Sequence, residues 1–256
     1  MKRDESMLIL ALETATVPGS LALARDGEVV EEIELPRDKY ISEALLPAID
    51  GLLGHAGVGP GELDILAFAI GPGSFTGLRV GLATIKGLAL VLGVPIAPVS
   101  SLCVVASAAD PKGGKVLRAV IAAGRGEVFS GVFHAEAGRV ETIDEEKRIR
   151  WADFWPEVRS GEIIAGLVPE SERARAKDRG AFVDSVRPSA GGVARRAFDQ
   201  IARGIASPEA MDVVSIRYLK PSWAEEVLGE RGAITGVVAE SVKAGAGGRG
   251  ITIEEM

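Results

Sequence analysis

The chain has 256 residues, of which 47% are hydrophobic and 25% are charged, proportions that are ordinary for a soluble globular protein. Its 29 basic and 36 acidic residues leave a net charge of -7 without a dense Lys/Arg block, so we expect no nucleic-acid binding by this chain alone. The single Cys103 excludes an internal disulfide, and the distant His55 and His134 predict no metal site. Residues 7–12 are too few to span a membrane, and the cytoplasm is the expected compartment.

The first hundred residues predict alternating strands and helices. A three-stranded meander comes first, then a helix, a buried strand, a second helix and a short strand. Gly54 is expected to end the first helix and Gly93 the second. The expected bounds, in chain order, are residues 8–12, 20–24, 28–35, 40–53, 63–70, 76–92 and 94–99.

The second half opens with a similar pattern. Three strands and two glycine-containing turns again form a meander, so the pattern starts twice, near residues 8 and 116. This favours a duplicated α/β unit, with a chance likeness of two hairpins as the alternative. The expected strands are 115–122, 128–133 and 139–143, followed by a buried strand 162–167, a solvated charged stretch 169–179, a helix 190–206 and a closing segment 212–219. The glycine-rich tail after Pro221 is expected to be partly mobile.

The most distinctive segment is the glycine-rich loop 71–79, with the sequence GPGSFTGLR. Its glycines and the helix start behind it suit either a bound anion or a closely packed backbone. Three standard motifs fail: the dinucleotide motif because Thr76 replaces a glycine, the Walker A motif because Leu78 replaces the lysine, and the esterase motif because Gly73 directly precedes Ser74. An ordinary strand-to-helix connection therefore remains the alternative.

Polar residues at strand ends and in this loop form the candidate ligand site, because α/β folds bind ligands there. The same hydroxyls would also serve well as helix caps, and we favour that interpretation because no histidine or lysine lies in the same motifs to act as a base. No catalytic residue and no metal ligand is therefore assigned. The candidate nucleotide or loop residues are Glu13, Thr14, Gly71, Gly73, Ser74, Thr76 and Gly77.

The predicted helix 76–92 carries only two charges, Arg79 and Lys86, and is apolar around most of its circumference. Such a helix is expected to be buried on nearly all sides, and the small residues at 77, 81, 83 and 87 would let another helix approach closely. An internal helix is one explanation, and pairing with helix 40–53 and a partner subunit is the other. The expected partner interface is Leu45, Ile49, Leu52, Leu78, Leu82 and Ile85, and Ile85→Glu is predicted to abolish association while the chain stays soluble.

Several strings taken together resemble the TsaB (YeaZ) family. The resemblance covers about residues 7–220 and is most specific in the glycine-rich loop. It rests on 10–15 (LALETA), 45–47 (LLP), 71–79 with Gly81, 87–89 (GLA), 125–129 (RGEVF, against the family's R-G-E-V-Y) and 218–220 (YLK, against Y-L-R).

The resemblance implies an α/β fold of two duplicated actin-like, Hsp70-like (ribonuclease H-like) lobes, each a mixed sheet flanked by helices. The lobes would be residues 1–105, which bind the partner, and 106–220, with 221–256 as an extension. It also implies a non-catalytic scaffold, required with the catalytic paralogue TsaD and the ATPase TsaE for threonylcarbamoyl transfer to adenosine 37 of tRNAs that read codons beginning with adenine. TsaC would supply threonylcarbamoyl-adenylate, tRNA would be met only through the complex, and the chain alone could form a homodimer.

The chain departs from the family pattern at three positions. Glu13 replaces the usual aspartate of the first strand, Ala122 replaces an acidic residue of the second meander, and Ile41 stands where a histidine is common. Actin-like folds that handle nucleotides keep carboxylates at such places for a metal or a water. We therefore expect no intrinsic cofactor and leave ATP binding open. The alternative function is an independent actin-like nucleotide-binding phosphotransferase or hydrolase.

Overall fold

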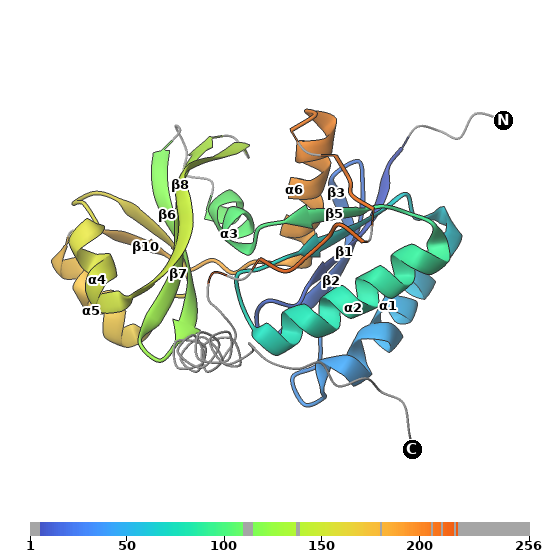
Figure 1. Cartoon of the computed structure of the whole chain (residues 1–256), viewed down its shortest axis with the longest axis horizontal. Helices are drawn as coiled ribbons and strands as arrows, with labels where there is room; N and C mark the ends of the chain where they lie inside the picture. Colours follow the sequence, from blue (N-terminus) through green and yellow to red (C-terminus); the bar gives the residue numbers. More distant parts are fainter. Residues whose placement is uncertain are drawn as a thin grey trace, which may run out of the picture. The chain divides into compact units, whose positions relative to one another are not determined.

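Two five-stranded sheets form the framework of the computed structural model, which describes residues 6–109, 115–136, 139–179, 181–205, 207–210, 212–217 and 219 (Figure 1). The turn positions 137 and 138, Tyr218, Lys220 and the predicted tail 221–256 lie outside the described residues. Predictions that concern them stay predictions.

The first sheet has the order β3-β2-β1-β4-β5. Its strands are β1 (Leu8–Glu13), β2 (Ser20–Arg25), β3 (Glu28–Glu34), β4 (Ile65–Ala69) and β5 (Ile96–Val99). The meander β1-β2-β3 is antiparallel, whereas β4 runs parallel to β1 and β5 parallel to β4. Both faces of β1 are buried, which explains why its sequence is a continuous apolar run and not an alternating one.

Helices cover both faces of this sheet. Helices α1 (Ile41–Ala56) and α2 (Phe75–Leu92) pack on the face that carries Leu10 and Leu12, and η1 (Pro60–Glu62) follows α1. Helix α6 (Ala190–Ala202) packs on the opposite face, against Ile9 and Ala11 (Figure 1). The alternation of neighbouring residues between two cores follows from the two-residue period of a strand.

The second sheet has the order β10-β9-β6-β7-β8, which is the order of the first sheet read from its other end. The meander β6-β7-β8 is antiparallel, and β9 and β10 are added in parallel. The predicted duplication and the actin-like fold class are thereby confirmed. The elements are β6 (Lys115–Gly124), β7 (Glu127–Glu136), β8 (Arg139–Arg150), β9 (Ile163–Gly166), β10 (Phe182–Asp184), α3 (Ser101–Ala109), α4 (Trp151–Phe154), η2 (Trp155–Glu157) and α5 (Glu170–Asp178).

The C-terminal part of the described chain returns to the first sheet, which corrects the predicted lobe 106–220. Helix α6 packs on that sheet through Val193 and Ala197, and Val214 is buried in the core beneath α1 and α2. Glu209 exchanges both backbone hydrogen bonds with Ile96 of β5. A division along the sequence near residue 105 therefore assigns these C-terminal segments to the wrong lobe.

Several predicted bounds also need correction. Helix α1 runs through Gly54 and ends at Gly57, which adopts the left-handed conformation. Strand β8 continues to Arg150 and not only to residue 143, because it pairs with β7 along most of its length. The sequence pattern missed α3, whose short apolar run has no clear helical period, and the charged stretch 169–179 contains helix α5 with only Ala176 buried.

Candidate functional site

The glycine-rich loop lies against the end of strand β1. The backbone N–H of Ser74 donates to the carbonyl of Ala15 at 2.7 Å. Ser74 is also the N-cap of α2, and its hydroxyl accepts from the N–H of Gly77 at 3.2 Å. The predicted capping role of Ser74 is therefore present in the structure.

Three glycines make this approach possible. A Cβ atom on Gly73 would overlap Ala15, and one on Gly77 would overlap the carbonyl oxygen of Thr14. A Cβ atom on Gly81 would overlap the Thr14 hydroxyl and the ring of Phe68. In the described structure the loop thus packs closely against a backbone segment. The backbone that it packs against is the chain's own.

Glu13 organises the segment beneath the loop. Its fully buried carboxylate accepts hydrogen bonds from the N–H groups of Ala15 (2.7 Å) and Thr16 (3.0 Å) and from the Thr16 hydroxyl (2.8 Å). Burial raises the pKa of Glu13 to about 7, although these hydrogen bonds and the positive charge of Arg187 act in the opposite direction. The carboxylate thus occupies backbone N–H groups that an anionic ligand would otherwise meet.

The structure brings most of the candidate nucleotide residues together, but in an internal contact. Thr14 is buried, and its hydroxyl has no hydrogen-bond partner among the described residues. Gly71, with φ +102°, lies against Leu78, while Thr76 is exposed on the first turn of α2. Within the described part of the chain, no group of three or more His, Cys, Asp or Glu side chains is arranged to hold a metal ion.

Five of the six residues expected at a partner interface are buried in the chain's own core. These are Leu45, Ile49, Leu52, Leu78 and Ile85, whereas Leu82 is half-buried. A partner can reach such side chains only if the core opens. Ile85→Glu would place a charge in this core, so it would test folding and not association.

Helices α1 and α2 also expose apolar side chains on the side that faces away from the first sheet. The prediction that α2 is buried on nearly all sides is wrong, because only five of its 18 residues are buried. Leu90 is 67% exposed and Val91 82%, and Leu46 of α1 is 55% exposed. By length and composition alone α2 would also qualify as a membrane-spanning helix, but its inner side is part of the first lobe's core.

Among the described residues, three glycines on these helices have open space, and no packed neighbour, where a side chain would stand. A Cβ atom on Gly51 or Gly54 of α1, or on Gly87 of α2, would meet nothing within 4 Å. All three are exposed. The spacing of the small residues 83 and 87 indicated this surface in the sequence. The predicted interface instead consisted of larger apolar residues, most of which the structure buries in the core.

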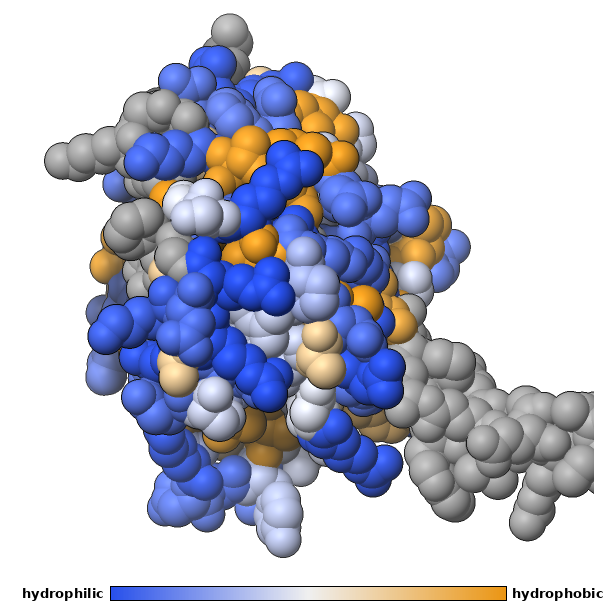
Figure 2. Space-filling view, turned by 90° about the vertical axis from the view of Figure 1, so that its left-hand side faces the viewer, coloured by the Kyte–Doolittle hydropathy of each residue, from blue (hydrophilic) through white to orange (hydrophobic). Residues whose placement is uncertain are grey.

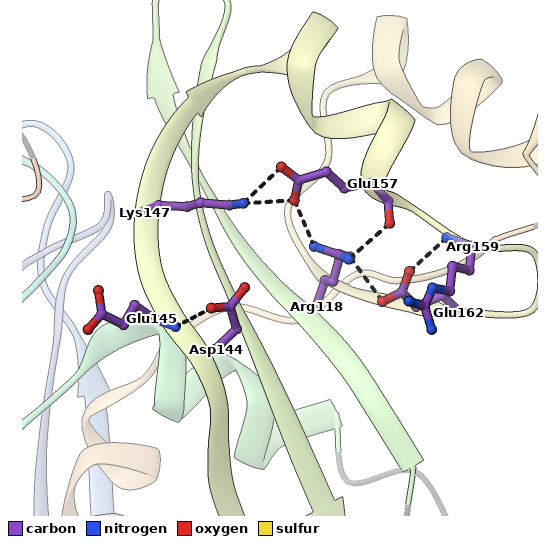
Figure 3. Close-up of polar contacts among 7 residues, drawn as sticks. All are labelled: Arg118, Asp144, Glu145, Lys147, Glu157, Arg159 and Glu162. Atoms are coloured by element: carbon purple, nitrogen blue, oxygen red, sulfur yellow. Dashed lines mark hydrogen bonds and ion pairs between the residues drawn. The ribbon is translucent and has the colours of Figure 1, made fainter.

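Several charged residues of the second lobe form one connected network (Figure 3). Arg118 of β6 contacts Glu162 at 2.9 Å and Glu157 at 3.3 Å, and Lys147 of β8 contacts Glu157 at 2.8 Å. This network fastens η2 to the outer face of the second sheet. The surface on the side of α4 and α5 is predominantly hydrophilic, with hydrophobic residues between the charged ones (Figure 2).

The R-G-E string at 125–127 forms the hairpin between β6 and β7. Arg125 has a positive φ of 50°, between two glycines that are also left-handed. Glu127 pairs with Arg148 of β8, and the carbonyl of Gly126 accepts from the N–H of Trp151 at 3.0 Å. The string therefore has a structural role in joining this hairpin to the strand and helix beside it.

Comparison with known proteins gives a consistent result. Residues 29–163 match the family described as TsaD: tRNA N6-adenosine threonylcarbamoyltransferase. The chain is 33% identical over 148 residues to the tRNA threonylcarbamoyladenosine biosynthesis protein TsaB of Bacillus subtilis (strain 168), covering 58% of this chain and 64% of that protein. It is 38% identical over 140 residues to TsaB of Escherichia coli (strain K12), covering 51% and 60%. These matches thus span less than two thirds of either relative.

A solved structure extends the likeness over most of the chain. YeaZ from Pseudomonas aeruginosa superposes with a TM-score of 0.70 at 27% identity, and the superposition covers 83% of this chain and 100% of that chain. The superposition thus extends over most of the part of the chain that carries the two five-stranded sheets.

Proposed function

Because the chain belongs to the TsaB (YeaZ) family, we propose that it is a non-catalytic scaffold subunit in the synthesis of N6-threonylcarbamoyladenosine on tRNA. Its partner would be a TsaD-like catalytic paralogue, and a TsaE-like ATPase would join them. The modified base would be adenosine 37 of tRNAs that read codons beginning with adenine. The tRNA would be met only through the complex, in the cytoplasm.

The observation that carries this proposal is the set of exposed glycines on α1 and α2. A glycine inside a helix costs about 1 kcal/mol relative to alanine, because it leaves more backbone entropy to be lost on folding. Gly77 and Gly81 have an internal reason, since Thr14 and Phe68 fill their space. Gly51, Gly54 and Gly87 have no such reason among the described residues. A second protein whose helices approach closely would supply the reason.

The remainder of this face suits the same partner. Both helices lie side by side on one face of the first sheet, so their outer sides point away from it together (Figure 1). Leu46, Leu90 and Val91 are exposed there. Along α2, the small Ala83 lies between Leu90 and the start of the helix, where Arg79 stacks on the ring of Phe75. Exposed apolar and small residues are typical of the centre of a protein interface, and the exposed Asp50, one helical turn from Leu46 and from Gly54, adds a carboxylate to this face.

The state of the glycine-rich loop supports a scaffold more than a phosphotransferase. The N–H groups of Ala15 and Thr16 are bound by Glu13, and the glycines of the loop accommodate the same segment. A nucleotide phosphate at this place would have to displace both. We therefore propose that any ATP used in the reaction is bound by the partner proteins.

A matched pair of arginine substitutions tests the partner face. Ala83 on α2 and Ala174 on α5 are both exposed alanines inside helices. We expect Ala83→Arg to prevent co-elution with the TsaD-like protein of the same organism, while Ala174→Arg co-elutes like the unmodified chain. Equal co-elution of the two variants, at unchanged circular dichroism, would show that this face is not the interface.

Activity measurements separate the scaffold from the alternative, an independent nucleotide phosphotransferase or hydrolase. The purified chain with ATP and magnesium should show no turnover. Modified adenosine should form only when the TsaD-like and TsaE-like proteins, tRNA and threonylcarbamoyl-adenylate are also present. Robust ATP turnover by the chain alone would overturn the scaffold proposal. Light scattering of the isolated chain would show whether it forms a homodimer when the partner is missing.

A further inference from the structure

One buried carboxylate joins three segments that are far apart in the sequence. Glu146 of β8 has a side chain that is only 3% exposed. The hydroxyl of Ser100, where the chain passes from β5 into α3, donates to one carboxylate oxygen, and Arg217 of the C-terminal segment pairs with the other at 3.1 Å. Ser100 also caps α3, because its hydroxyl accepts from the N–H of Cys103 at 3.3 Å.

The same junction includes the first residue of the glycine-rich loop. The N–H of Ser101 donates to the carbonyl of Gly71 at 2.8 Å, and the N–H of Arg217 donates to the carbonyl of Ile70 at 2.9 Å. A Cβ atom on Gly71 would be tightly placed, 3.0 Å from Leu78 Cδ1 and 3.3 Å from the Arg217 carbonyl oxygen, and the φ of +102° also disfavours a side chain. The crossover between the two sheets, the C-terminal segment and the start of the glycine-rich loop therefore meet at one point, and Glu146 holds them from the second sheet.

Stability alone does not explain why Glu146 is placed at this junction. Burial raises the pKa of Glu146, and the hydrogen bond from Ser100 and the charge of Arg217 act in the opposite direction without cancelling it. Its ionised form is therefore less favourable in the folded chain than in water. The Arg217 side chain is 50% exposed, so solvent screens its attraction to the buried carboxylate and the pair contributes little to stability. The contacts of Glu146 instead fix the positions of the segments that they join. Cys103 lies nearby, and its burial together with the charge of Glu146 raises the pKa of its thiol.

We propose that Glu146 is a positioning residue that latches the crossover at Ser100 and the C-terminal segment at Arg217 to the second sheet. Through Gly71 the latch also fixes the beginning of the glycine-rich loop that leads into α2. The assignment goes beyond the scaffold function and does not depend on the identity of a partner.

Hydrogen–deuterium exchange on the full chain tests the latch. The variants are Glu146→Gln, which removes the charge at nearly constant shape, and Glu145→Gln on the adjacent, exposed residue as the matched control. We expect Glu146→Gln to accelerate exchange about tenfold in residues 98–104 and 212–217 and to leave the melting temperature unchanged or higher. Glu145→Gln should change neither measurement.

A second variant approaches the same contact from the other side. Arg217→Met should accelerate exchange in the same two segments, and the double variant with Glu146→Gln should exchange no faster than the faster single variant. Unchanged exchange in both segments for Glu146→Gln would overturn the proposal. A fall in melting temperature with faster exchange throughout the chain would also overturn it, because it would mean that Glu146 only supports the global fold.

Discussion

The two sides of helix α2 use glycine for different physical reasons. On the inner side, Gly77 and Gly81 are packed against Thr14 and Phe68 so closely that no other residue fits. On the outer side, Gly87 faces open space, as do the exposed glycines of α1. The inner glycines are explained by the fold of this chain alone. The outer ones weaken their helices and have no packing reason among the described residues, so we look for that reason in a partner protein.

The largest effect is expected on the inner side. Gly77→Ala would force a methyl group into the carbonyl of Thr14, and since this is backbone it cannot move aside by changing a rotamer. We expect a loss of about 3 kcal/mol in the free energy of unfolding, measured by chemical denaturation. A loss below about 0.5 kcal/mol would mean that the loop does not pack as described.

A pH titration sharpens the account of the segment beneath the loop. Because the pKa of Glu13 is raised from 4.5 to about 7, the folded chain binds this proton more tightly than the unfolded chain. Stability from this group is therefore complete below pH 4.5 and is lost as the pH rises through 7, by about 3 kcal/mol. Glu13→Gln should remove most of that slope in denaturation experiments between pH 5 and pH 8. The raised pKa of Glu146 gives a slope of the same sign.

The outer side gives a smaller and opposite pattern. Gly87→Leu adds a side chain where the isolated chain has room, so its free energy of unfolding should not fall. Affinity for the TsaD-like partner, measured by titration calorimetry, should fall tenfold or more, which is about 1.4 kcal/mol. If the variant binds as tightly as the unmodified chain, the outer glycines do not mark the interface.

The smallest effect is expected for an alanine at the outer glycine Gly87. Gly87→Ala should raise the stability of the isolated chain by about 1 kcal/mol, because alanine is the better helix former and meets no neighbour. The same measurement as for Gly77→Ala applies, and the two variants should shift the denaturation midpoint in opposite directions. Shifts in the same direction would break the distinction between the two sides.

Local sequence patterns were sufficient for much of the fold. Continuous apolar runs marked β1 and β4, helical spacing marked α1 and α2, and two similar meanders indicated a duplication that both sheets confirm. These features depend on residues near one another in the chain, so their periods are visible without a partner. Glycine closed α2 at Gly93 as expected, but not α1 at Gly54, since a helix tolerates an exposed glycine at a modest cost.

The sequence by itself determined the strand–loop–helix alternation, the duplication and the glycine-rich string that indicated the family. Only the tertiary structure decided which side of each helix is buried. It also decided that Thr14 packs against the glycines Gly77 and Gly81, and that α6 and Arg217 return to the first lobe. The reason is physical. A helix such as α2, which is apolar around most of its circumference, has no strong polar face that would show which side is exposed. A glycine in the sequence also does not indicate whether its missing side chain makes room for the chain's own backbone or for another protein.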